Sequence, residues 1–130
     1  MMRLILPFLF LLVAADSYAA SPVKRKAIPA AFHGDWALET RECAVGPTDS
    51  GNLRMTARKV ILFEMIGKVM HVTVVDPQTI WVKSRITHGN AAYNSVEVFD
   101  NLEMMSLSPD GQKLTTGEDE VMLVYKRCAK

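Results

Sequence analysis

Cysteine is scarce in this chain, since only Cys43 and Cys128 occur among its 130 residues. Neither belongs to a Cys-x-x-Cys pair, so the spacing typical of redox motifs and zinc sites is missing. In an oxidising compartment, two such cysteines most simply form one disulfide. A Cys43–Cys128 bridge would close a loop of about 85 residues and, by chain entropy, stabilise the fold by roughly 4 kcal/mol.

The chain also lacks the short motifs that carry well-known chemistry. It has no Gly-x-Ser-x-Gly, phosphate-binding loop, His-Glu-x-x-His or EF-hand pattern. Its histidines fall in separate predicted elements: His33, His71 and His88. The adjacent pairs Met70-His71 and Met104-Met105 can each offer only one side chain to a shared metal site, because neighbours on a strand point to opposite faces. We therefore expect no enzyme activity, no catalytic residue, no metal and no cofactor.

No strong charge of one sign marks the chain. Fifteen basic residues against fourteen acidic ones leave a net charge of +1, which provides no global attraction to nucleic acid. The one basic cluster, Lys24-Arg25-Lys26, is typical of a solvated tail. Contact of this cluster with anionic lipid or glycan stays an alternative. We expect no nucleic-acid partner.

The one long apolar run lies at the N-terminus. A basic start at Arg3 precedes an apolar stretch over 4–15, and Ser17-Tyr18-Ala19 places small residues at the positions that a signal peptidase reads. The run is shorter than the about 20 residues that cross a bilayer, although a retained anchor is the alternative. We predict a signal peptide over 1–19, periplasmic or secreted localisation, and no membrane span after cleavage.

An extended lead-in over 20–31 is followed by patterns of period two, and no long amphipathic helix is evident. The first strand is expected to place Phe32, Gly34, Trp36 and Leu38 on one face. Further strands are expected over 53–64 (one or two strands), 69–75, 79–87, 93–107 (a long strand or a bulged pair), 113–116 and 120–128. The turns between them are predicted at Gly67-Lys68, at 88–90 and, most strongly, at 108–111, where Pro109 precedes Asp110-Gly111.

Seven or eight short strands joined by short turns predict an up-and-down barrel or a sandwich. Cys43 follows the first predicted strand and Cys128 ends the last. A bridge between them would fasten the seam of a closed barrel, which favours the barrel. We therefore predict an all-β, small antiparallel up-and-down barrel of about 7–8 strands over 32–130, with one disulfide, and we expect a monomer.

The segment Phe32-His33-Gly34-Asp35-Trp36 resembles the Gly-x-Trp opening of the lipocalin and calycin barrels. In those barrels the tryptophan plugs the base beneath a short N-terminal turn, so the resemblance implies the same place for Trp36. The pattern of Phe32-x-Gly34-x-Trp36, then Cys43, then Arg127-Cys128 also resembles a recurrent group of small, uncharacterised exported proteins of proteobacteria. Neither resemblance implies an activity, and a small barrel can be filled by its own side chains.

A candidate surface patch lies in the predicted strand over 79–87. Its alternation places three apolar residues on the inner face: Ile80, Val82 and Ile86. Lys83 and Arg85 are costly to bury unpaired and so mark the outer face, and Trp81 shares their parity. An outward tryptophan beside two cations can contact a protein or a glycan. The alternative is that the lead-in or a loop covers Trp81.

The leading functional hypothesis is a non-enzymatic exported binding module that acts through its loops and outer face. Its partner would be an unknown protein or glycan of the cell envelope, and one version is an inhibitor of a cell-wall hydrolase, by analogy of fold alone. The alternative is a lipocalin-like carrier of a small apolar ligand. An empty apolar cavity would favour the carrier, whereas a packed interior would favour the surface binder.

Overall fold

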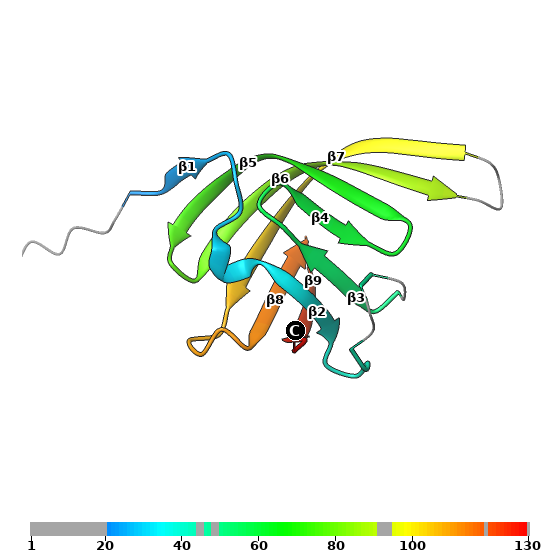
Figure 1. The fold of residues 1–130 in the computed structure, drawn as a ribbon. Coiled ribbons are helices and arrows are strands. Elements are labelled where there is room, and N and C mark those ends of the chain that lie inside the picture. Colours follow the sequence, from blue (N-terminus) through cyan, green and yellow to red (C-terminus); the bar gives the residue numbers. More distant parts are fainter. Residues whose placement is uncertain (1–20, 44–45, 48–49, 91–94, 119, 130) are drawn as a thin grey trace, which may run out of the picture.

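The computed structural model describes residues 21–43, 46–47, 50–90, 95–118 and 120–129 (Figure 1). The predicted signal peptide over 1–19 lies outside these residues. The described part contains one short 3₁₀ helix, Ala30–Phe32, and no helix in it is long and apolar enough to span a bilayer. Its strands are β1 (Val23–Arg25), β2 (Gly34–Leu38), β3 (Asn52–Met55), β4 (Lys59–Leu62), β5 (Met65–Asp76), β6 (Thr79–Asn90), β7 (Ser95–Leu107), β8 (Lys113–Glu118) and β9 (Val121–Arg127).

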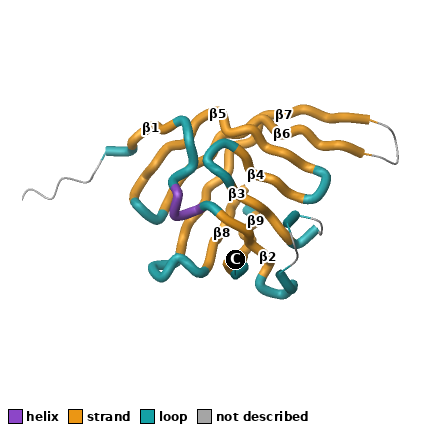
Figure 2. The backbone as a smooth tube through the Cα atoms, viewed as in Figure 1, coloured by secondary structure: helices purple, strands orange, loops and turns teal. Residues whose placement is uncertain are grey.

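Strands β2 to β9 form a closed, eight-stranded, antiparallel barrel (Figure 2). Each strand pairs with the next along the chain, from β2 with β3 to β8 with β9. The pairing of Trp36 with Arg127 and of Leu38 with Tyr125 joins β2 to β9 and closes the ring. The predicted all-β, up-and-down barrel is confirmed.

The predicted disulfide is also confirmed. Cys43 and Cys128 are bonded, and their Cα atoms lie 5.7 Å apart. Cys128 follows β9 directly, and its N–H donates to the carbonyl of Asp35 on β2 at 2.9 Å. The bridge therefore reinforces the seam at which the first and last barrel strands meet.

The lead-in is part of the folded structure. Strand β1 pairs with β5 outside the ring, with Val23 opposite Val74 and Arg25 opposite Val72. Ile28 is buried, and its N–H donates to the carbonyl of Ala57 at 2.8 Å. Phe32, which we predicted on the first strand, lies instead in the 3₁₀ helix and is fully buried.

The predicted turn at Gly67-Lys68 is wrong. The chain turns earlier, at Glu64, which takes the left-handed backbone angle φ of 60°, and Gly67 lies inside β5 opposite Val60 and Ile86. A Cβ atom on Gly67 would come within 3.0 Å of the Ile86 Cδ1 atom. Close strand packing, and not a turn, explains this glycine.

The predicted turn over 88–90 is also wrong, because β6 continues through these residues. His88 pairs with Glu97, Gly89 with Val96 and Asn90 with Ser95. The predicted turn over 108–111 is present. There Gly111 has a φ of 71°, and Asp110 accepts hydrogen bonds from the Ser108 hydroxyl and the Gln112 N–H, which lower the pKa of its carboxyl.

Candidate functional site

One end of the barrel is closed by Trp36, which is fully buried. Its indole Nε1–H donates to the carbonyl of Phe32 at 3.1 Å, and the Arg127 guanidinium lies 4.2 Å from the centroid of its ring. Gly34 has a φ of 123°, and a Cβ atom there would lie 3.3 Å from the Arg127 guanidinium. The glycine two residues before Trp36 therefore makes room for Arg127.

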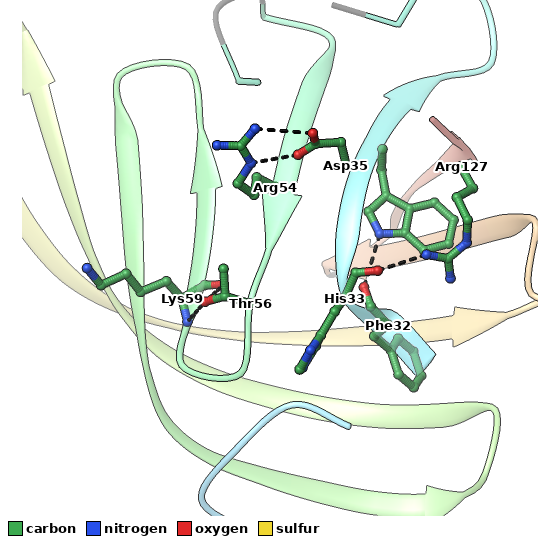
Figure 3. Close-up of polar contacts among 8 residues, drawn as sticks. Phe32, His33, Asp35, Arg54, Thr56, Lys59 and Arg127 are labelled. Atoms are coloured by element: carbon green, nitrogen blue, oxygen red, sulfur yellow. Dashed lines mark hydrogen bonds and ion pairs between the residues drawn. The ribbon is translucent and has the colours of Figure 1, made fainter. Parts of the chain in front are cut away.

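Arg127 holds the 3₁₀ segment against this end (Figure 3). Its guanidinium donates to the carbonyls of Ala31 at 2.7 Å and His33 at 2.8 Å, and its Nε–H donates to Gly111 at 2.9 Å. The sequence pattern that ends in Arg127-Cys128 included this arginine but did not predict that it contacts the 3₁₀ segment. Each of its three guanidinium nitrogens donates one hydrogen bond within the chain, so Arg127 has a structural role.

A depression of about 480 Å³ lies beside the closed end. It is lined by Arg54 and Asp35, whose side chains form an ion pair at 2.7 Å, and by Arg127. The Asp35 carboxylate raises the pKa of Arg54 by a hydrogen bond and by its charge. Because these charged groups already bind one another or the backbone, the depression offers little to a charged ligand.

The opposite end of the barrel is open and contains a pocket of about 220 Å³. Its walls come from inward positions of β4, β5, β6, β7 and β9, and include Leu62, Met65, Ile86, Phe99 and Leu123. Between this pocket and the closed end, the interior is packed by large side chains that are fully buried. They include Phe32, Met55, Ile80, Met105 and Leu114.

Four polar residues line the pocket among its apolar walls: Ser84, Asn101, Glu103 and Tyr125. Burial and, to a smaller degree, the negative charge of Glu103 raise the pKa of the Tyr125 phenol, which therefore stays neutral at physiological pH. A neutral phenol can donate or accept a hydrogen bond. The pocket thus combines apolar surface with a few polar groups, as ligand and anchor pockets do.

Exposed apolar side chains lie on both faces of the strands at this end of the barrel, with Val96 and Val98 on the outer face of β7. On β7, Val96 and Val98 are 67% and 60% exposed, and on β9, Val121 is 63% exposed. Phe63 and Ile66, near the β4–β5 turn, are also exposed. Figure 1 shows β6 and β7 extending past the other strands at this end. Large exposed apolar patches of this kind mark interaction sites.

Trp81, Lys83 and Arg85 lie on the outer face of β6, opposite Met104, Leu102 and Asp100 of β7. Trp81 is 41% exposed. The lead-in does not cover it, because β1 pairs with the edge of β5 that faces away from β6. Arg85 donates to the Asp100 carboxylate at 3.1 Å, so its charge is partly engaged.

The immediate surroundings of Trp81 are apolar. With Leu102, Met104, Gly117 and Met122, it lines an outer groove of about 370 Å³. A Cβ atom on Gly117 would lie 2.6 Å from the Met122 sulfur, so the glycine allows this methionine to lie flat on the sheet. The outer surface is therefore an aromatic and thioether groove, with the two cations at its side.

We expect the two tryptophans to differ in their access to acrylamide. In a Trp36→Phe variant the fluorescence of Trp81 should be strongly quenched, because Trp81 is 41% exposed. In a Trp81→Phe variant the fluorescence of Trp36 should be protected, because Trp36 is 0% exposed. Equal Stern–Volmer constants would contradict the outward position of Trp81.

Sequence reasoning did not find the pocket at the open end. One signal was available, because Ser84 interrupts the inward apolar series of Ile80, Val82 and Ile86. A small polar residue at an inward position leaves space that a larger apolar side chain would fill. Among the described residues, no group of three or more His, Cys, Asp or Glu side chains could hold a metal ion.

The Gly34 and Trp36 likeness to lipocalin openings stays a prediction, although the buried Trp36 lies beneath the 3₁₀ segment as that likeness implies. The barrel fold alone does not indicate a function. The disulfide fits a protein of an oxidising compartment. Comparison of the chain with protein-family models, with curated proteins and with solved structures finds no match.

Proposed function

We propose that this protein is a non-enzymatic, periplasmic or secreted binding module whose binding site is the open end of the barrel. The observation that carries this proposal is an anchor-sized pocket at the same end as exposed apolar residues, with Val121 on the inner face of β9 and with Val96 and Val98 on the outer face of β7. Interfaces commonly place an apolar anchor side chain in a pocket and surround it with further contacts. Inhibition of a cell-wall hydrolase would be one form of such binding.

The size of the pocket favours a protein partner over an enclosed small molecule. Its volume of about 220 Å³ lies below the roughly 300–1,000 Å³ of pockets that enclose drug-sized ligands. The interior towards Trp36 is packed, so the pocket does not continue through the barrel. A side chain of a partner would fill this volume while the partner backbone stays outside.

A photo-cross-linking experiment tests the site. Benzoylphenylalanine at Val98, on the outer face of β7 beside the pocket-lining Phe99, should cross-link a partner in an envelope extract, whereas the same residue at Val75 should not. Val75 is also exposed, but it lies towards the other end of β5. Leu123→Trp, which fills the mouth of the pocket, should abolish the cross-link at Val98. Equal cross-linking at Val75, or no effect of Leu123→Trp, would contradict the proposal.

The carrier of a small apolar ligand is the second candidate, because the pocket walls are mainly apolar. It predicts saturable binding of the neutral fluorescent probe N-phenyl-1-naphthylamine, with one site per chain and loss of binding in Leu123→Trp. Weak, unsaturable fluorescence that Leu123→Trp leaves unchanged would leave the protein partner as the better assignment.

A further inference from the structure

Strand β7 has a free edge at the open end of the barrel. It spans Ser95–Leu107, yet β8 pairs only with Met104 to Leu107. Residues 95–102 pair with β6 along one edge, and no described strand pairs with their other edge. Their outward N–H and C=O groups are therefore available to a further strand.

Most devices by which proteins protect a strand edge are missing here. Residues 95–102 contain no proline and no lysine, and the pairing of β6 with β7 runs through twelve consecutive residue pairs without a bulge. Four of the side chains beside the edge are apolar and exposed, namely Val96, Val98 and Leu102 on the outer face and Phe99 on the inner face. An added strand would cover them by cross-strand packing.

The acidic residues of β7 favour a basic partner strand over a second copy of β7. The charged residues of β7 are Glu97, Asp100 and Glu103, and the strand has no basic residue. A second copy of β7 would bring acidic strands together, which disfavours self-pairing. Asp100 lies on the outer face and already accepts a hydrogen bond from Arg85, whereas Glu97 lies on the inner face with Phe99. A segment that carries Lys or Arg opposite Glu97 would be attracted instead.

We propose that the partner inserts an extended peptide segment of alternating apolar and basic residues, which adds as a strand to the free edge of β7. The inference rests on the proposed function and gives its partner a chemical class. Strand alternation then places the basic side chains on the inner face and the apolar ones on the outer face, over Val96, Val98 and Leu102. Because Phe99 and Asn101 line the pocket together with Glu103, a basic side chain opposite them would enter it, with its aliphatic stem against the apolar walls. Backbone hydrogen bonds would provide affinity, and the pocket and the carboxylates would provide specificity.

The test uses a fluorescently labelled nine-residue peptide of alternating valine and lysine, titrated into the intact protein by anisotropy. We expect the Glu97→Lys variant to bind about tenfold more weakly, since an attractive cross-strand pair becomes repulsive. The matched control is Glu42→Lys, which makes the same change on the exposed β2–β3 loop and should bind as the unmodified protein does. A peptide with glutamate in place of lysine, and one with every amide nitrogen methylated, should each bind at least about tenfold more weakly.

Hydrogen exchange of the protein with and without the peptide identifies the mode of binding. Strand addition should slow exchange of backbone amides within 95–102, and only of those that point away from β6. Equal binding of the N-methylated peptide, or no protection within 95–102, would overturn strand addition. Sedimentation that shows a dimer lost in Glu97→Lys would also overturn it, because a second copy would then occupy the edge.

The two proposals fail separately. Suppose that the probe at Val98 cross-links a partner and that Leu123→Trp abolishes this cross-link, but that the peptide neither binds nor protects β7. The open end then remains the binding site, and strand addition is wrong. If cross-linking at Val98 and Val75 is equal, the proposed function itself is wrong.

Discussion

Replacement of Trp36 by alanine is expected to lower the free energy of unfolding by about 3–5 kcal/mol, the usual cost of truncating a large core aromatic. The side chain is fully buried, donates a hydrogen bond to Phe32 and lies against the Arg127 guanidinium. The variant would leave a cavity at the closed end and would remove the surface on which Arg127 rests. Urea unfolding followed by far-ultraviolet circular dichroism measures the difference.

Trp81→Ala is the matched control, because it makes the same substitution at a side chain that is 41% exposed. Its effect should be much smaller than that of Trp36→Ala, in the range of surface substitutions. A loss below about 1 kcal/mol for Trp36→Ala would show that this position behaves as a surface site. The likeness to lipocalin openings would then be misleading.

Removal of the disulfide should cost about 4 kcal/mol, because the bridge joins residues separated by 85 positions and restricts the unfolded chain. The double variant Cys43→Ser, Cys128→Ser removes the bridge without leaving a reactive thiol. Its midpoint in urea should fall well below that of the oxidised protein, and it should match the reduced protein. A variant as stable as the oxidised protein would contradict this account.

The oxidised monomer should expose no thiol even when it is unfolded, since both cysteines of the chain are in the bridge. Labelling under denaturing, non-reducing conditions measures this. Two labelled cysteines per chain would refute the bridge, and a dimer that reduction dissociates would indicate pairing between chains.

The barrel could be predicted from the sequence because its strands alternate cleanly. Ile80, Val82 and Ile86 face the interior, while Trp81 and Arg85 are exposed. Burial of one face fixes the register of such a strand, because a shift by one residue would reverse every side chain. The positions of the two cysteines then favoured closure of the sheet.

Two turn predictions were wrong for opposite reasons: a real turn lacks the usual turn residues, and an extended segment contains them. The turn between β4 and β5 uses Glu64 in a left-handed conformation, without glycine, proline, asparagine or aspartate. His88-Gly89-Asn90 has the composition of a turn, but pairing with β7 keeps these residues extended. Here tertiary pairing overrode local preference.

The site at the open end was beyond sequence reasoning for a different reason. The pocket depends on which inward residues of five strands meet. The free edge depends on β7 extending beyond the residues that pair with β8. Strand boundaries are the least certain part of any sequence interpretation. The outward parity of Trp81 could be predicted, whereas its methionine neighbours across β7 and β9 required the register.

The closure of the ring by β2 and β9 has a kinetic consequence. Arg127 contacts the carbonyls of His33 and Ala31 across 94 and 96 positions of the chain, so the closed end cannot form until β9 is available. Folds dominated by contacts between distant residues fold slowly, on the order of milliseconds to seconds. Until β9 arrives, β2 and β8 each present an open edge, so newly made chains pass through an interval in which aggregation competes with closure.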